Sequence, residues 1–230
     1  MLRLEKLVIV QDGFRLEADL TLEAGRKYAV IGPSGAGKST LLSALCGFIP
    51  PASGRMIWEG RDITDTAPGA RPMTMLFQDN NLFPHLTVLQ NVGLGLRPDL
   101  RLSQAERARV GEALAQVDLA QFSGVKPGNL SGGQQSRVAL ARVLVQARPL
   151  VLLDEPFAAL GPALRNEMLD LVGEMVTQTG AALIMVTHAP EDVRRIADEV
   201  IFVEGGQAHA PRPCAALMDD PPPELRAYLG

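Results

Sequence analysis

The chain has 230 residues, 47% of them hydrophobic and 21% charged, which suits one globular domain of ordinary composition with a full core. Its formal net charge of −4 makes it a poor candidate for a protein that coats nucleic acid, because such proteins carry a basic surface. The longest apolar runs are shorter than the about 20 residues that cross a bilayer, so any membrane role requires a partner that supplies the spans.

The first part of the chain predicts strands and one helix. Residues 2–10 and 14–22 alternate apolar and polar side chains, which indicates antiparallel strands joined by a turn with Asp-Gly chemistry. Residues 27–31 are apolar and rich in strand-forming side chains, so they predict a third strand. A helix pattern follows over 41–46, and Gly47 can close that helix.

Between the third strand and the helix lies a glycine-rich segment with the pattern G-x-x-x-x-G-K-[ST], which is typical of a loop that cradles nucleotide phosphates. Its glycines allow positive φ and a close approach to an anion, while the helix N-terminus supplies amide donors. We expect Lys38 to reach the β- and γ-phosphates and the Ser39 hydroxyl to ligate Mg²⁺. The nucleotide-binding residues predicted in this phosphate loop are Gly32, Pro33, Ser34, Gly35, Ala36, Gly37, Lys38, Ser39 and Thr40.

The middle of the chain changes from strands to helices. Residues 56–63 predict a hairpin, and residues 73–77 predict a strand that ends at Gln78. From residue 87 to residue 148 the pattern is mainly helical. Two longer helices are expected there, one over 105–117 that Ser103 and Glu106 cap and one over 131–147 that Pro149 ends.

The last third of the chain alternates strands and helices. The expected elements are a buried strand over 150–153, a helix over 162–179, a buried strand over 181–186, a short helix over 190–197 and a hairpin over 199–208. This alternation predicts an α/β fold with a mostly parallel core sheet, to which an N-terminal antiparallel β subdomain and an inserted helical subdomain are added. We expect a nucleotide-binding core with the β subdomain over 1–84 and 149–210, a helical subdomain over 85–148 and a C-terminal tail over 211–230.

Two carboxylates end the buried strand over 150–153. Asp154 and Glu155 stand where open α/β sheets form their ligand sites, at the carboxyl end of a strand. We assign Asp154 to Mg²⁺ and Glu155 to the water that attacks the nucleotide.

A second glycine-rich segment heads the helix over 131–147. Ser131 can cap this helix, and Gly132 and Gly133, followed by Gln134, expose its first amides to an anion. One small chain therefore has two helices that begin with glycines, and we expect both helix N-termini to bind the same nucleotide.

Together these motifs resemble those of the ATP-binding subunits of ABC transporters. The resemblance rests on the phosphate loop, Gln78 after a strand, the second glycine-rich segment, the acidic pair and His188. It implies the P-loop ABC ATPase fold and a head-to-tail homodimer, in which the second glycine-rich segment of one subunit closes on the ATP and Mg²⁺ held by the other. It also implies that Gln78 contacts Mg²⁺ or the attacking water, and that His188 contacts the γ-phosphate near Glu155.

The resemblance further implies partners and a location. Integral membrane permease subunits would bind the chain, a periplasmic solute-binding protein would act on it indirectly, and no nucleic acid would take part. The chain would be a peripheral subunit on the cytoplasmic face of the inner membrane. DNA-repair ATPases with the same motifs are a distant alternative, because they carry coiled coils or zinc modules between the two glycine-rich segments and this chain has neither there.

Three positions depart from the ABC pattern. Gly161 stands where an aspartate usually bridges the two nucleotide sites, which puts the coupling between the sites in question. The aromatic residue that stacks on adenine falls in register near Val10 or Gln11, so Phe14 is the candidate that replaces it. The sequence Gln134-Gln135-Ser136-Arg137 replaces the commoner Gln-x-Gln-Arg.

The stretch from Phe77 to Leu96 is most similar to the ATPases of bacterial thiamine importers, above all at 80–83 and 93–96. This similarity predicts an ATP-hydrolysing subunit that powers the import of thiamine and its phosphates. Related importers of iron, polyamines or anions have similar sequences and stay open as alternatives, since other subunits touch the solute.

Overall fold

One mixed sheet organises residues 1–229, the part of the chain that the computed structural model describes, with side chains described through Arg226. Its strands are β1 (Leu2–Gln11), β2 (Phe14–Leu22), β3 (Lys27–Ile31), β4 (Ser53–Trp58), β5 (Arg61–Asp62), β6 (Met73–Leu76), β7 (Leu150–Asp154), β8 (Ala182–Val186), β9 (Glu199–Glu204), β10 (Gln207–Ala208) and β11 (Arg212–Pro213). The strand order is β5-β4-β1-β2-β10-β9-β3-β8-β7-β6, and β11 pairs with β9. The neighbours from β9 to β6 are parallel, whereas β1, β2, β4 and β5 pair antiparallel.

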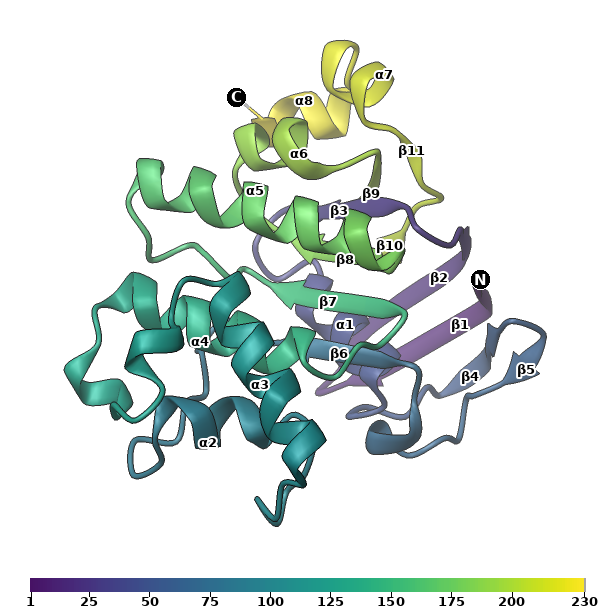
Figure 1. The fold of residues 1–230 in the computed structure, drawn as a ribbon. Coiled ribbons are helices and arrows are strands. Elements are labelled where there is room, and N and C mark those ends of the chain that lie inside the picture. Colours follow the sequence, from purple (N-terminus) through teal and green to yellow (C-terminus); the bar gives the residue numbers. More distant parts are fainter. Residues whose placement is uncertain (230) are drawn as a thin grey trace.

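Helices cover both faces of the sheet and extend beyond its β6 edge (Figure 1). They are α1 (Lys38–Cys46), α2 (Val88–Gly93), α3 (Gln104–Gln116), α4 (Gly132–Leu144), α5 (Pro162–Thr179), α6 (Pro190–Ile196), α7 (Cys214–Asp219) and α8 (Pro223–Leu229). Figure 1 shows α5 and α6 on one face, α1 on the other face, and α2, α3 and α4 gathered beside β6 and β7. The predicted α/β fold with a mostly parallel core sheet is therefore confirmed.

The strand β7 shows why its sequence reads as a continuous apolar run. Leu150 and Leu152 pack into the hydrophobic cluster that contains α1 and the antiparallel strands, whereas Val151 and Leu153 pack into the cluster that contains α5. Because alternate side chains of a strand point to opposite faces, both faces of β7 are buried. Only the carboxyl end of the strand, at Asp154, is left to carry polar chemistry.

The helices α2, α3 and α4 have a hydrophobic cluster of their own, between β6 and β7 in the chain. Capping boxes begin all three helices, including the predicted one formed by Ser103 and Glu106. Val138 of α4 packs inside this helical cluster, whereas Leu140 and Val143 of the same helix pack against the sheet. Helix α4 therefore connects the helical segment to the core.

Several elements differ from their predicted bounds. Helix α1 begins at Lys38, inside the phosphate loop, because Gly37, with φ of 100°, is the last non-helical residue and its carbonyl oxygen accepts from the Leu41 N–H at 2.8 Å. Helix α4 ends at Leu144 because Ala147, with φ of 50°, turns the chain back towards β7. The tail, for which the sequence gives no clear pattern, forms β11, α7 and α8, since Leu217 and its apolar neighbours bury themselves against β9.

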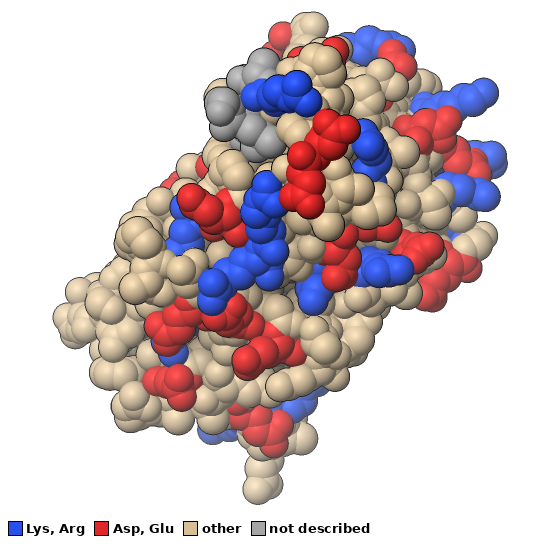
Figure 2. Space-filling model, turned by 90° about the horizontal axis from the view of Figure 1, so that it is seen from above, with Lys and Arg blue, Asp and Glu red and all other residues tan. Residues whose placement is uncertain are grey.

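Over the described residues, the face that carries α6, α7 and α8 has charges of both signs, with no large patch of one sign (Figure 2). Figure 2 shows Lys and Arg interspersed with Asp and Glu over that face. Within residues 1–229, no helix combines the length and the apolar character that a membrane crossing needs.

A buried cation holds the C-terminal end of α1. The guanidinium of Arg71, whose residue is 2% exposed, donates from Nη1 to the carbonyl oxygens of Ala44 at 2.9 Å and Leu45 at 2.6 Å. Its Nε donates to the Thr66 carbonyl oxygen at 2.8 Å, and its Nη2 donates to the Thr64 carbonyl oxygen at 2.8 Å. Burial lowers the pKa of Arg71, while the negative end of the helix dipole favours the charge. Arg71 thus ties α1 to the loop before β6.

Candidate active site

The phosphate loop joins β3, a central strand of the sheet, to α1. Gly32 has φ of 152°, and a Cβ atom at this position would lie 2.0 Å from the carbonyl oxygen of Val203 on β9. Gly37 also has a positive φ and immediately precedes the first amides of α1. Only glycine fits the first position and only glycine adopts the second at low cost, so the sequence itself dictates a loop that presents backbone amides at a helix N-terminus.

A cavity of about 440 Å³ opens over this loop. The residues that line it come from the β1–β2 turn, the phosphate loop and the segments that follow β7 and β8: Gln11, Asp12, Phe14, Ser34, Gly35, Gly37, Lys38, Ser39, Thr40, Glu155 and His188. The ends of β7 and β8 meet there because the two strands are parallel neighbours. The fold therefore brings together most of the residues that the motifs nominate.

Lys38 is a buried cation at this cavity. It is 5% exposed, and its Nζ donates to the carbonyl oxygens of Gly32 and Pro33, both at 2.8 Å. Burial lowers the pKa of the ammonium, and the charges of Glu155 and Asp154 oppose that shift. Its hydrogen-bond partners are neutral carbonyl groups, so the approach of phosphate oxygens would supply the full negative charge that these groups do not provide.

Ser39 and Asp154 place two oxygen atoms side by side, one from α1 and one from β7. The Ser39 hydroxyl donates to Asp154 Oδ1 at 3.0 Å. Burial raises the pKa of Asp154, and the hydrogen bond from Ser39 lowers it. Hydroxyl and carboxylate oxygens are ligands that Mg²⁺ accepts, and it commonly takes the rest of its ligands from water and substrate phosphates. Consistent with a site of so few protein ligands, the described residues hold no group of three or more His, Cys, Asp and Glu that could bind a metal.

Glu155 and His188 form a polar pair at the carboxyl ends of β7 and β8. The Nε2 atom of His188 lies 2.6 Å from Oε1 of Glu155. Glu155 has φ of 46°, which is uncommon for a residue with a Cβ atom, and its N–H donates to the carbonyl oxygen of Val186 at 3.1 Å. A strained conformation of this kind costs on the order of 1–2 kcal/mol and is found most often at functional sites. It turns the Glu155 carboxylate from the strand end into the cavity.

Several predicted residues are not among those that line the cavity. Gly32 and Pro33 accept from Lys38 through their carbonyl oxygens, Asp154 accepts from the lining residue Ser39, and Ala36 packs in the hydrophobic core. Gln78 is exposed just after β6. Ser131 and Gln134 form a capping box at the start of α4, with the Ser131 Oγ accepting from the Gln134 N–H at 3.3 Å and the Gln134 Oε1 accepting from the Ser131 N–H at 2.9 Å. Gly132 is exposed beside them, whereas Gly133 is buried against Leu164, whose Cδ2 would have to move because a Cβ atom at Gly133 would lie 2.4 Å from it.

The structure also adds a residue that the motifs miss. Asp12 lines the cavity from the β1–β2 turn, although its sequence predicts only a turn, and Gln11 lines it near the position where the register expects the adenine-stacking aromatic. No local pattern could have placed Asp12 there, because its position depends on how the β1–β2 hairpin lies against the phosphate loop.

Known proteins resemble this chain over most or all of its length. The family model described as ABC transporter matches residues 16–158. The chain is 60% identical to the thiamine import ATP-binding protein ThiQ of Cereibacter sphaeroides and 58% identical to that of Ruegeria sp., with all of both chains covered in each case. It is 48% identical to the protein of the same name from Yersinia pseudotuberculosis, over 95% of this chain and 93% of the relative.

Solved structures resemble the chain as well. The ATP-binding cassette MJ0796, a dimer in a post-hydrolysis state bound to ADP and Pi, is 29% identical with a TM-score of 0.80, over 93% of this chain and 99% of that chain. The ADP conformation of the cassette MJ1267 is 25% identical with a TM-score of 0.89, over 100% of this chain and 98% of that chain. A likeness of sequence and of fold that extends over the whole chain shows that the protein belongs to the ABC transporter family, as one of its ATP-binding subunits.

Proposed function

We propose that the chain is the ATP-hydrolysing subunit that powers a thiamine importer. The observation that carries the reaction is the cavity in which Lys38, Ser39 and the Glu155–His188 pair meet over one phosphate loop, with Asp154 hydrogen-bonded to Ser39. The assignment of thiamine as the transported solute is supported by the name shared by relatives that are 47–60% identical over the whole chain. Those names favour thiamine over iron, polyamines or anions.

In the proposed reaction, the loop amides and Lys38 hold the β- and γ-phosphates of ATP. Ser39, Asp154 and Gln78 are the residues that would hold Mg²⁺, which would neutralise charge on the phosphates. The Glu155 carboxylate takes a proton from the attacking water, and His188 holds that water and the γ-phosphate in line. The 2.6 Å contact between Glu155 and His188 supports this division of labour.

The second half of each site would come from another copy of the chain. Ser131 and Gly132 are exposed and lie outside the cavity of their own subunit, yet they head a helix whose amides can bind an anion. A head-to-tail homodimer brings this segment onto the γ-phosphate of the partner's ATP, and the cassette MJ0796 is itself dimeric. ATP binding closes the dimer, and hydrolysis removes contacts and opens it.

Different segments of the chain would have different roles in the assembled transporter. The segments 1–84 and 149–210 form the nucleotide-binding core, and 85–148 acts as the helical unit that moves against it. Gln78 and the residues after it contact permease subunits in the membrane, so the chain works at the cytoplasmic face of the inner membrane. A periplasmic solute-binding protein then acts on it only through the permease.

Reconstitution tests the transport assignment. We expect the chain, co-purified with its permease and placed in vesicles with the binding protein, to hydrolyse ATP faster when thiamine is added. Iron, putrescine and sulfate serve as alternative solutes, and Lys38→Met serves as the variant that cannot hold the phosphates. Stimulation by another solute and not by thiamine would reject the thiamine assignment but keep the ATPase.

Replacing Phe14 by Ala is expected to weaken ATP binding about 5-fold, the equivalent of about 1 kcal/mol for a lost aromatic stack. The Phe14 ring lies at the cavity against the phosphate loop, with Cε1 2.7 Å from where a Cβ atom of Gly37 would stand. Val10 is outside the cavity lining and 48% exposed, so Val10→Ala is the matched control. Calorimetric titration with ATP measures both dissociation constants, and equal affinities in the two variants would remove Phe14 from the adenine site.

Replacing Gly161 by Asp is expected to raise the free energy of unfolding by a few tenths of a kcal/mol up to about 1 kcal/mol. Gly161 is the N-cap of α5 with φ of −66°, no side chain caps this helix, and a Cβ atom would meet nothing within 4 Å. Urea denaturation measures the gain against Gly161→Ala. If the aspartate also restores coupling between the sites, the rate of ATP hydrolysis rises in the aspartate variant alone, whereas equal rates would make Gly161 harmless.

A further inference from the structure

A partly buried ion pair lies beside the segment that carries His188. It joins Arg165, in the first turns of α5, to Asp192 on α6. The Nε of Arg165 donates to Asp192 Oδ2 at 3.0 Å, and Nη2 donates to the same oxygen. The Asp192 side chain is only 7% exposed, so this carboxylate depends on its protein partners.

Thr187 connects this pair to the backbone on both sides of His188. Its hydroxyl donates to Asp192 Oδ2 at 2.7 Å and accepts from the Ala189 N–H at 3.2 Å. Thr187 is also 3% exposed, so water does not compete for these bonds. The hydroxyl therefore fixes the two residues that bracket His188.

The loop that follows Glu155 ends where α5 begins. The backbone N–H of Arg165 donates to the carbonyl oxygen of Gly161, the N-cap of α5, at 2.9 Å, so Arg165 stands one helical turn after the end of that loop. A second cavity, of about 350 Å³, lies between these parts, and Arg165, Asp192, Thr187, Glu155 and His188 are among its lining residues. Polar contacts border this space: the Thr187 hydroxyl donates to Asp192 Oδ2, and His188 Nε2 lies 2.6 Å from Glu155 Oε1.

We propose that Arg165, Asp192 and Thr187 are positioning residues that hold His188 against Glu155 and tie it to the 156–161 loop. The inference rests on the proposed role of His188 and Glu155 in hydrolysis. Gly161 carries no side chain with which the loop could bridge the sites, so the Arg165–Asp192 pair links the loop to His188 inside one subunit.

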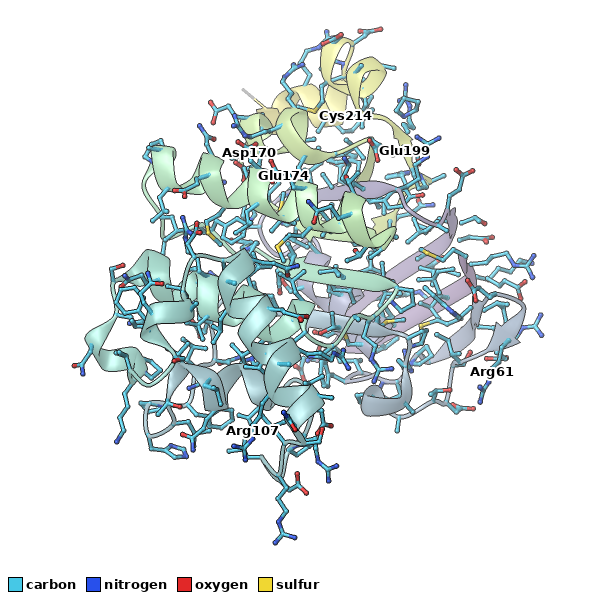
Figure 3. The ribbon with its side chains drawn as sticks, viewed as in Figure 1. Arg61, Arg107, Asp170, Glu174, Glu199 and Cys214 are labelled. Atoms are coloured by element: carbon cyan, nitrogen blue, oxygen red, sulfur yellow. The ribbon has the colours of Figure 1, made fainter. Side chains whose placement is uncertain are left out.

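A second ion pair between the same helices supplies a matched control. Arg195 of α6 donates from Nε to Asp170 Oδ1 of α5 at 2.7 Å and from Nη2 to Oδ2 at 2.5 Å. Both side chains are exposed, and neither lines the two cavities at His188. Figure 3 labels Asp170 on α5. A general loosening of α5 against α6 would follow from changing either pair, whereas misplacement of His188 would follow only from changing the partly buried pair.

The test measures the rate of single-turnover ATP hydrolysis with protein in excess. The variants are Asp192→Asn, Thr187→Val and Asp170→Asn, and each is made both with His188 intact and together with His188→Gln.

With His188 intact, we expect Asp192→Asn and Thr187→Val to lower the rate about tenfold or more and to change ATP affinity by less than about twofold. Thr187→Ser keeps the hydroxyl and is expected to restore most of the rate. Asp170→Asn is expected to match the wild-type chain. In the His188→Gln background, Asp192→Asn and Thr187→Val should cost less than about twofold more, because the residue they position is already gone.

A spectroscopic readout separates positioning from simple destabilisation. The chain has three histidines, so the ring ¹³Cε1–¹H signal of His188 is assigned by its loss in His188→Gln. We expect Asp192→Asn and Thr187→Val to shift this signal and Asp170→Asn to leave it unchanged. If Asp192→Asn fails to fold, Thr187→Val decides the test.

Two results separate the inference from the function on which it rests. The positioning role would be overturned if Asp192→Asn and Thr187→Val lowered the rate by the same factor in the His188→Gln background as with His188 intact. An unshifted His188 signal in these variants would overturn it as well. Either result would leave His188 in the reaction. A wild-type rate in His188→Gln itself would instead overturn the proposed role of His188.

Discussion

Replacing Glu155 by Gln is expected to lower the rate of ATP hydrolysis by about 100-fold or more while ATP still binds. The amide has nearly the shape of the carboxylate but cannot take the proton from the attacking water. Lys38 and Ser39, which hold the phosphates and the Mg²⁺ in the proposed site, do not change. ATP therefore stays bound between two subunits, and a stable dimer should accumulate with Mg²⁺ and ATP. Phosphate release measures the rate, and light scattering after gel filtration measures the dimer.

Glu199→Gln is the matched control for this experiment. Glu199 begins β9, which runs parallel to β3, so it lies at the end of the strand away from the phosphate loop. The control is expected to hydrolyse ATP at the wild-type rate and to form no stable dimer. Wild-type hydrolysis by Glu155→Gln would show that Glu155 is not the base, and a slow variant that stays monomeric with ATP would contradict the shared nucleotide.

Replacing Arg71 by Met is expected to lower the free energy of unfolding by about 3 kcal/mol or more. The change removes a buried cation that donates to four carbonyl oxygens, on Ala44, Leu45, Thr64 and Thr66. Methionine fills most of the volume but removes the guanidinium donor from all four acceptors, of which Ala44 keeps only the Gly47 N–H at 3.0 Å. Urea denaturation followed by circular dichroism measures the loss.

Two further arginine variants sharpen this result. Arg71→Lys keeps the charge but replaces the planar fork by one ammonium, so it should recover only part of the loss. Arg61→Met changes an exposed arginine of β5, labelled in Figure 3, and should alter stability by less than about 0.5 kcal/mol. If Arg71→Met were as stable as the wild-type chain, the carbonyl oxygens would have found other donors, and Arg71 would not be what ties α1 to the loop before β6.

Much of the fold follows from local sequence. The alternation over β1 and β2, the apolar run of β7 and the capping box at Ser103 each reflect a physical preference within about ten residues. The pattern of the phosphate loop is equally local, since Gly32 and Gly37 are required by backbone conformation and a close approach. Predictions failed at element ends: α4 ends early because Ala147 turns the chain towards β7, and α1 begins early because Gly37 ends the preceding loop conformation.

The amino-acid sequence alone determined the chemistry that this protein carries: a glycine loop for phosphates, Lys38 within it, and a carboxylate pair at a strand end. The tertiary structure alone decided which of these groups meet. It places the β1–β2 turn on the nucleotide cavity, leaves Ser131 outside it, and pairs Arg165 with the buried Asp192 beside the segment that carries His188. The reason is physical: local preferences act over a few bonds, whereas buried ion pairs and cavities depend on segments that only the packing of the sheet and helices brings together.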